Sequence, residues 1–294
     1  MGILLGLSAA LAWGVGDFFA AHLSRLAGTR TAPLYTQSLG VLVSTLLVVV
    51  WSGRMPDAAP RVWLAVTALG VVHACATIWF YRALEVGKVS LTMPIVSSFA
   101  VVTVALAILS GERPERLAIL GAAISLTGLL LVVSGSRGDI EVKRSTAASS
   151  QERSGVPEAI GAALCFGVTF WGMDSIEPQL GTPWLLLMLR VVTLPILCAV
   201  FFFSRHTPKV VVPREAIGVL GLCAIVVILC DTIAWVAVGV GRQSADVSIV
   251  TTLASLYSAV TICLAGLLWR ERLQRRQWIG VAVILTGIGL VGIG

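Results

Sequence analysis

The sequence predicts an all-α polytopic membrane protein, and three observations support this. Hydrophobic residues make up 57% of the 294 positions, which is more apolar surface than one soluble core of this size requires. They gather in ten runs, each long enough to cross a bilayer as a helix. The runs are continuous and lack the ten-residue alternation of a membrane β-barrel, so their backbone hydrogen bonds must be satisfied within helices.

Short polar or Gly/Pro segments separate the ten predicted helices. Their predicted bounds are 2–24, 32–52, 61–82, 89–110, 117–134, 157–178, 183–203, 215–240, 246–269 and 277–293. One longer polar segment, 136–155, is rich in Ser, Ala, Arg and Glu and predicts a flexible linker. The linker separates two domains of five helices each, 1–135 and 156–294.

The two domains are diverged repeats of one another. Several residues recur 159 positions later: Gly121, Ala123, Leu126, Thr127 and Gly128 match Gly280, Ala282, Leu285, Thr286 and Gly287. With small gaps, Asp17 also matches Asp174, and Trp79 matches Trp235. Because each repeat holds an odd number of helices, the second must enter the membrane in the opposite orientation. Such inverted repeats are typical of secondary transporters.

Basic residues predict the orientation. With the N-terminus outside, fifteen Lys and Arg side chains fall in cytoplasmic loops and five on the other side, with Arg190 inside a helix. Cytoplasmic loops carry the excess of Lys and Arg in membrane proteins. The sequence therefore predicts a multi-pass protein of the cell inner membrane with both termini extracytoplasmic.

Several classes of function and cofactor are disfavoured. The six cysteines lie within apolar runs and form no CxxC pair, so neither a disulfide framework nor a metal site is predicted. The net charge of +6 is explained by loop residues that set topology, so no nucleic-acid partner is expected. No Walker A sequence is present, which argues against ATP as the driving force, and no cofactor is expected.

The chain resembles the EamA-type carriers of the drug/metabolite transporter superfamily. The matching segments are Ala12-Trp13-Gly14, the stretch from Ser248 to Glu271-Arg272-Leu273, its counterpart from Ser90 to Glu112-Arg113, and both Leu-Thr-Gly helices. The resemblance implies a central path lined mainly by helices 1, 3, 4, 6, 8 and 9. Many members are drawn with cytoplasmic termini, unlike the orientation predicted here. No single substrate is implied, because the family carries amino acids, sugars, nucleotide derivatives, cations and drugs.

Five ionisable residues lie inside the apolar runs: Asp17, His73, Asp174, Arg190 and Asp231. A charge at the middle of a membrane helix costs roughly 2.5–3.5 kcal/mol, so such residues usually face a hydrated path or one another. Similar depth on consecutive helices predicts an Asp174–Arg190 ion pair, which either gates a carrier or only fixes two helices. Gln37 is the repeat equivalent of Arg190.

No basic partner is evident for Asp17 or Asp231, so we expect these two carboxyls to bind a cationic group or a proton. His73 is either a proton carrier or a neutral histidine hydrogen-bonded to a neighbouring helix. Glu112 and Glu271, each followed by an arginine at a helix boundary, predict helix caps or surface ion pairs.

Hydroxyl and aromatic side chains complete the candidate site. Hydroxyl groups recur at helical spacing and either line a hydrated path or join helices; the candidates are Ser97, Ser98, Thr251 and Ser255, with Tyr257 beside them. Pro94 is expected to bend its helix. Trp13, Trp79 and Trp235 lie deep enough to stack on a substrate or simply to pack in the core.

The function predicted from these features is secondary active transport. The substrate is expected to be a small polar or zwitterionic, amino-acid-like metabolite, exported in exchange for protons by a monomer or homodimer. Uptake of an organic cation is the alternative within transport. A membrane enzyme or a non-transporting scaffold is the alternative of another class. The sequence contains no recognisable catalytic motif, which argues against an enzyme. A scaffold would not need five ionisable groups within the membrane.

We predict that green fluorescent protein fused to the C-terminus will stay dark, because the fluorescent protein does not mature when it is exported by the general secretory route. Whole-cell fluorescence of the fusion measures this. Bright fluorescence in the membrane fraction would place the C-terminus in the cytoplasm and contradict the fifteen-to-five asymmetry of basic residues.

Overall fold

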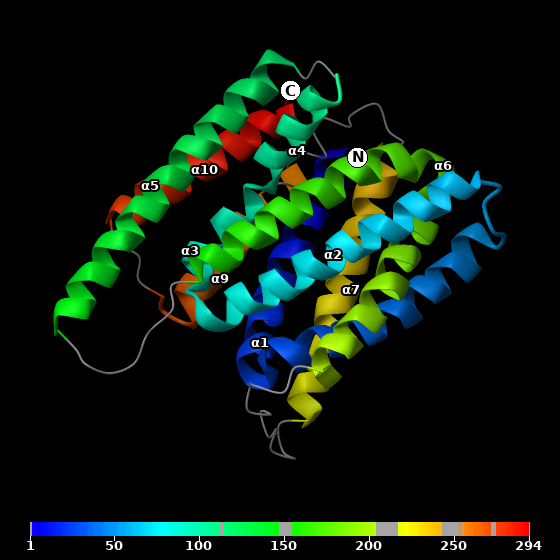
Figure 1. Cartoon of the computed structure of the whole chain (residues 1–294), viewed down its shortest axis with the longest axis horizontal. Helices are drawn as coiled ribbons and strands as arrows, with labels where there is room; N and C mark the ends of the chain where they lie inside the picture. Colours follow the sequence, from blue (N-terminus) through cyan, green and yellow to red (C-terminus); the bar gives the residue numbers. More distant parts are fainter. Residues whose placement is uncertain are drawn as a thin grey trace.

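The computed structural model describes residues 2–111, 115–146, 155–203, 217–242, 253–254, 256–271 and 275–293, and every regular element within them is a helix (Figure 1). The helices are α1 Gly2–Leu47, which continues as the π-helix η1 Val48–Ser52, then α2 Pro60–Val86, α3 Val89–Ser97, α4 Phe99–Leu109, α5 Arg116–Thr146, α6 Val156–Phe203, α7 Ile217–Arg242, α9 Tyr257–Leu268 and α10 Arg275–Ile293.

Five helical stretches are long and apolar enough to cross a membrane, which agrees with a multi-pass membrane protein. Two of them exceed one crossing by far: Ile3–Ser52 has 50 residues and Val156–Phe203 has 48, roughly 75 and 72 Å of helix at 1.5 Å per residue. Each is interrupted at a glycine with positive φ, Gly28 at 76° and Gly181 at 74°. The chain changes direction there (Figure 1). Glycine adopts this conformation without the steric cost that a side chain brings.

The observed helices extend the predicted ones. The connections expected at 25–31 and 179–182 are reduced to the two glycine breaks, because a single left-handed residue is enough to redirect a helix. The helix expected at 89–110 is divided at Ser98, one turn after Pro94, into α3 and α4. α5 continues to Thr146, so the first part of the segment predicted as a linker is helical, and 147–154 lies outside the described residues.

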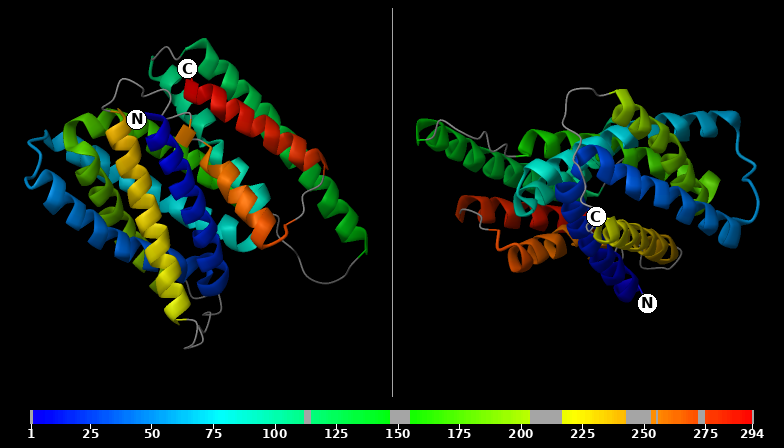
Figure 2. Two further views of the ribbon diagram at one scale, coloured as in Figure 1. Left: turned by 180° about the vertical axis from the view of Figure 1, so that it is seen from behind. Right: turned by 90° about the horizontal axis from the view of Figure 1, so that it is seen from below.

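Helices from the two halves of the chain pack against one another. α1 lies against α7, α2 against α6, and α5 against α10. The α5–α10 pair forms one side of the molecule (Figure 2). α3 is the most enclosed element, because every residue from Val89 to Ser97 is buried. The core therefore lies between the halves and is not confined to either of them.

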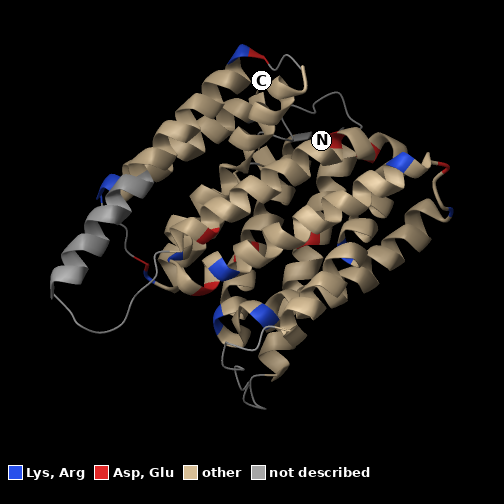
Figure 3. Ribbon diagram, in the orientation of Figure 1, with Lys and Arg blue, Asp and Glu red and all other residues tan. Residues whose placement is uncertain are grey.

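Charged residues are sparse along the middles of the helices and gather mostly toward their ends (Figure 3). Many large apolar side chains point outward instead, for example Leu4, Leu109 and Phe203, which are 71%, 82% and 83% exposed. Such a surface suits hydrocarbon surroundings.

Glycines set the close approach of α5 to α10. A Cβ on Gly121 would lie 2.5 Å from the carbonyl oxygen of Gly287, and one on Gly128 would lie 2.6 Å from the amide nitrogen of Ile284. Ser125 Oγ donates a hydrogen bond to the carbonyl oxygen of Ile284 at 3.1 Å. Backbone contact of this kind is a common means of helix association in membranes.

We predict that Gly287→Ala will destabilise the protein by about 1–3 kcal/mol, because the added methyl group would collide with the backbone of Ser125 and Gly121. Gly289→Ala is the matched control on the same helix, because nothing lies within 4 Å of the position that its added methyl group would take. Thermal unfolding in detergent should show a lower melting temperature for the first variant only. Equal melting temperatures would contradict the packing argument.

Candidate functional site

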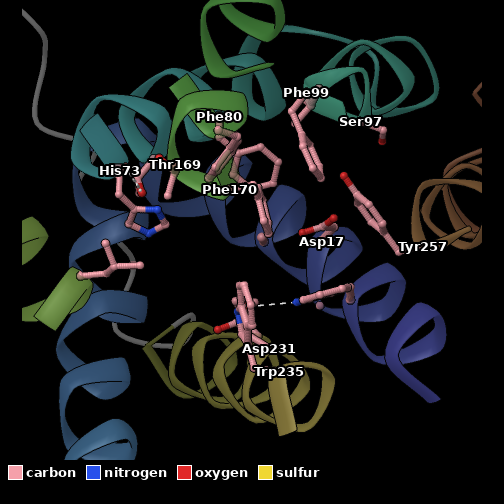
Figure 4. A pocket seen from close by; sticks show the side chains of 18 of the residues that line it. Asp17, His73, Phe80, Ser97, Phe99, Thr169, Phe170, Asp231, Trp235 and Tyr257 are labelled. Carbon is pink, nitrogen blue, oxygen red and sulfur yellow. Dashed lines mark hydrogen bonds between the residues drawn. The ribbon is translucent and has the colours of Figure 1, made fainter. Parts of the chain in front are cut away.

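A cavity of about 340 Å³ lies between the halves of the molecule, and helices α1, α2, α3, α4, α6, α7, α9 and α10 contribute to its wall (Figure 4). Most of the wall is apolar or aromatic. Ionisable and polar side chains enter it at a few points, namely Asp17, Thr36, Gln37, His73, Thr77, Tyr81, Ser97, Thr169, Arg190, Asp231 and Tyr257. An apolar cavity with few convergent polar groups is the usual form of a small-molecule site.

An ion pair in the cavity joins α6 to α7. Arg190 Nη2 donates a hydrogen bond to Asp231 Oδ2 within an ion pair, and Trp13 Nε1 donates to Asp231 Oδ1 at 3.3 Å. The Arg190 side chain is 6% exposed and that of Asp231 is 32% exposed. Both carboxylate oxygens of Asp231 are therefore engaged, one by each half of the chain.

This contact corrects two sequence predictions. Arg190 pairs with Asp231 and not with Asp174, and Asp231 has the basic partner that the sequence did not reveal. The reason is tertiary, since α7 lies beside α6 at this depth, whereas the side chain of Asp174 points to the exposed surface and does not line the cavity.

Gly40 admits the guanidinium group of Arg190. A Cβ at residue 40 would lie 2.5 Å from Nη1 and 3.0 Å from Cδ of Arg190. Nη1 is fully buried and has no hydrogen-bond partner among the described residues. Gln37, one turn earlier on α1, also has a buried side-chain oxygen that accepts no hydrogen bond from the described residues. The arginine is thus held in place by packing on one side and by Asp231 on the other.

Asp17 lines the cavity without a fixed partner. Within the described part of the chain it accepts no hydrogen bond and forms no ion pair, although it lies within electrostatic reach of Asp231. Figure 4 shows its carboxylate between Tyr257 and Phe170. A carboxylate in such surroundings requires a proton, water or a cationic group for compensation.

Aromatic rings form much of the remaining wall. Phe99 and Phe170 stack with centroids 4.5 Å apart, and Phe170 stacks on Trp235 at 5.8 Å. Trp235 in turn meets Trp13 edge to face at 5.4 Å, and Trp13 meets Tyr257 at 6.0 Å. Figure 4 shows Phe99, Phe170 and Tyr257 around Asp17. Aromatic faces attract cations and stack on planar groups.

His73 lies on α2 at the opposite part of the wall from Tyr257 (Figure 4). Its ring meets Phe166 at 5.9 Å, and Nδ1 is buried without a partner among the described residues. The alternative explanation of His73 was a neutral histidine hydrogen-bonded to a neighbouring helix. Nδ1 makes no such hydrogen bond with the described residues. His73 also lies within electrostatic reach of Arg190.

Most other predicted site residues can also be placed. Gln37, Ser97, Trp13, Trp235 and Tyr257 line the cavity. Two do not: Ser98 Oγ donates to the carbonyl oxygen of Ile95 at 2.6 Å, and Trp79 is 41% exposed beside Gly161. Thr251 and Ser255 lie outside the described residues.

Helix geometry explains why Asp17 and Asp174 differ. The α1 residues that line the cavity, 13, 16, 17 and 20, have the same spacing as 166, 169, 170 and 173 on α6. By this spacing Asp17 corresponds to Phe170, one turn away from the sequence match to Asp174. At about 100° per residue, Asp174 lies roughly 90° around α6 from the centre of the lining face.

Sequence reasoning missed the phenylalanines of the wall, which are Phe80, Phe99, Phe166 and Phe170. An apolar ring within an apolar run carries no signal of its own. The spacing of Trp13, Gly16 and Asp17 recurs in Phe166, Thr169 and Phe170, and it would have identified two of these phenylalanines had the repeats been aligned one turn differently. Among the described residues, no group of three or more His, Cys, Asp or Glu could hold a metal ion.

Comparisons with known proteins agree with this architecture. The family model described as EamA-like transporter family matches the chain twice, over residues 1–134 and 153–293. No curated protein matches. A solved structure described only as the crystal structure of a protein aligns with 98% of this chain and 95% of its own, with a TM-score of 0.60 and 18% sequence identity. At that identity the likeness concerns the fold alone.

We predict that Arg190→Gln and Asp231→Asn will each cost up to about 3 kcal/mol of stability, because each leaves a partly buried charge without its partner. The double variant should lose less than the sum of the two. Melting temperatures of the four proteins in detergent complete the double-mutant cycle. Asp174→Asn combined with Arg190→Gln is the control and should be additive. Additivity between residues 190 and 231 would show that their contact contributes nothing.

Proposed function

Since the chain belongs to the EamA-like transporter family, we propose that it is a secondary carrier that moves a small zwitterionic, amino-acid-like metabolite out of the cell in exchange for protons. The observation that carries this proposal is the cavity in which Asp17 has no partner among the described residues while Arg190 and Asp231 pair with each other. The proposed topology, mechanism, substrate and coupling follow in turn.

The proposed topology has ten membrane-spanning segments in two inverted repeats of five. It is supported by the two family matches and by the glycine breaks of α1 and α6, each of which divides a helix of nearly 50 residues into two arms long enough to span. Because the number of segments per repeat is odd, the two repeats have opposite orientations.

The proposed mechanism is alternating access by rocking of the two repeats. The cavity wall draws on both, with Asp17, Gln37 and His73 from the first and Arg190 and Asp231 from the second. A substrate that binds between two such units becomes accessible at one end when the units separate there and at the other end when they close.

The charge balance of the cavity favours a substrate with a positive group. Asp17, Arg190 and Asp231 are the acidic and basic side chains on the described wall apart from His73. Arg190 and Asp231 neutralise each other, which leaves one negative charge at Asp17. An ammonium group beside Asp17 would neutralise this negative charge, and the aromatic wall would add cation–π attraction. A carboxylate on the same substrate would find a hydrogen-bond donor in Arg190, whose Nη1 has no partner among the described residues.

Proton exchange follows from competition for a single carboxyl group. If Asp17 binds either a proton or the ammonium group, each turnover exchanges one for the other, because the two cannot occupy it together. An inward proton gradient then drives the metabolite outward. Coupling of this kind requires no further site.

The second candidate is uptake of an organic cation. The stacked series Phe99, Phe170 and Trp235 favours it, because a bulky cation without a carboxylate would gain most from contact with aromatic faces. A cation entering down the membrane potential would need no proton exchange. Flux measurements at fixed pH with an imposed potential distinguish the two candidates.

We predict that Asp17→Asn will fold normally and reduce proton-driven export at least about tenfold in proteoliposomes, because the amide takes up no proton and offers no negative charge to an ammonium group. Radiolabelled amino-acid mixtures, with and without a pH gradient, provide the measurement. Asp57→Asn is the matched control, because Asp57 lies in an exposed segment between η1 and α2. Full gradient-dependent export by Asp17→Asn would refute the assignment.

A further inference from the structure

Glu271 makes a set of contacts that its sequence context does not reveal. Its carboxylate accepts hydrogen bonds from Arg25 Nη2 at 2.9 Å, from Ser90 Oγ at 2.8 Å, and from the backbone amides of Ser90 and Val89 at 2.9 and 3.3 Å. The side chain is only 9% exposed. We call these four residues, Arg25, Val89, Ser90 and Glu271, the Glu271 cluster.

Glu271 caps a helix that belongs to the other half of the chain. The N-cap residue of α3, Lys88, supplies no side-chain hydrogen bond to the helix. The first amides of α3 are therefore satisfied from outside by Glu271, whose negative charge also suits the positive end of the helix. The sequence predicted a cap or a surface ion pair, and the structure shows both: Glu271 caps α3 and forms an ion pair with Arg25, so that it joins the two repeats.

Arg25 ties a third helix to the same point. Its guanidinium donates to the carbonyl oxygen of Gly87 at 3.1 Å and lies 3.9 Å from the ring centroid of Trp269. Trp269 in turn packs on Phe18 at 4.7 Å. The end of the first arm of α1, the start of α3 and the residues after α9 are thus joined by one carboxylate and one guanidinium group.

A buried layer lies between the Glu271 cluster and the central cavity. Ser24, next to Arg25, is 0% exposed and donates to the carbonyl oxygen of Tyr81 at 2.7 Å. The hydroxyl of Tyr81 is hydrogen-bonded to Thr36 Oγ1 at 2.9 Å, and both residues line the cavity. Position 24 is therefore closed to solvent, and it lies next to Arg25 of the cluster and in contact with the cavity wall.

We propose that the Glu271 cluster holds the carrier closed at this end and has to separate before the cavity can open there. The inference rests on the alternating access proposed above. Any rocking of one repeat against the other that opens this end must pull Glu271 away from Arg25 and from α3, because the partners come from different repeats. Hydrogen bonds to a carboxylate are stronger than those between neutral groups. Their loss therefore shifts the equilibrium between the closed and the open state of this end appreciably.

The test measures accessibility of Ser24→Cys in a full-length chain whose six native cysteines are replaced by alanine or serine. The protein is placed in lipid nanodiscs and treated with a charged maleimide, without any substrate. In this background the thiol should react slowly, because position 24 is buried. Glu271→Gln should raise the labelling rate roughly tenfold or more, since the amide cannot pair with Arg25 and turns a donor toward the end of α3.

Two further variants make the result decisive. Ser90→Ala removes one hydroxyl donor and should raise the rate about threefold without disturbing the fold. Glu177→Gln is the matched control and should keep the parent rate, because Glu177 accepts a hydrogen bond from Thr182, which lies in the same repeat. Melting temperatures confirm which variants are folded.

The proposal is overturned if Glu271→Gln and Ser90→Ala both fold and both label at the same rate as the Ser24→Cys parent. If Glu271→Gln does not fold, a labelling rate of Ser90→Ala equal to that of the parent is enough to overturn it. A rise in Glu177→Gln equal to that in Glu271→Gln would also overturn it, because the effect would then be general loosening. No substrate enters the measurement, so its outcome is independent of whether the exported metabolite has been assigned correctly.

Discussion

Hydrocarbon offers no hydrogen-bond partner to a charge or a backbone amide, and this constraint governs where the polar groups of the protein lie. The described backbone is almost wholly helical, so its amides are satisfied locally. Charged side chains within the apolar helices need partners from elsewhere in the fold. Arg190 finds Asp231, and Asp231 also receives the indole N–H of Trp13 from the other half of the chain. Asp17 shares their cavity without such a partner among the described residues, which makes it the group most open to a ligand or a proton.

The same constraint makes the polar contacts between the repeats specific. Apolar side chains slide past one another at modest cost, whereas an ion pair or a capped helix end has discrete arrangements. The contact between Trp13 and Asp231 lies at the cavity, and the Glu271 cluster lies at one end of it. Other polar contacts join the halves elsewhere, for example the Arg82–Glu158 ion pair and the hydrogen bond from Ser125 to Ile284.

Close backbone packing joins the two halves of the chain elsewhere. α5 and α10 meet through glycines and the hydroxyl of Ser125 at one side of the molecule, and α10 also contributes Ile288 and Val291 to the cavity wall. A rigid lateral pair of this kind can hold the two repeats together while other helices shift. The glycines at 28 and 181 perform a different task, since each permits a sharp change of direction within a long helix.

The amino-acid sequence by itself determined the class of the protein and its family, because apolar runs, loop arginines and the repeated Gly/Thr and Glu-Arg pairs are local features. It also identified Asp17, His73, Arg190 and Asp231 as candidate site residues, all of which line the cavity, since a charge in an apolar run is conspicuous wherever it lies. It could not decide that Arg190 pairs with Asp231, that Asp174 faces outward, or that Glu271 caps α3. Those facts depend on the rotation of each helix about its axis and on which helix lies beside it. Only the tertiary structure decided them, because rotation by a single residue, about 100°, moves a side chain from the cavity to the lipid.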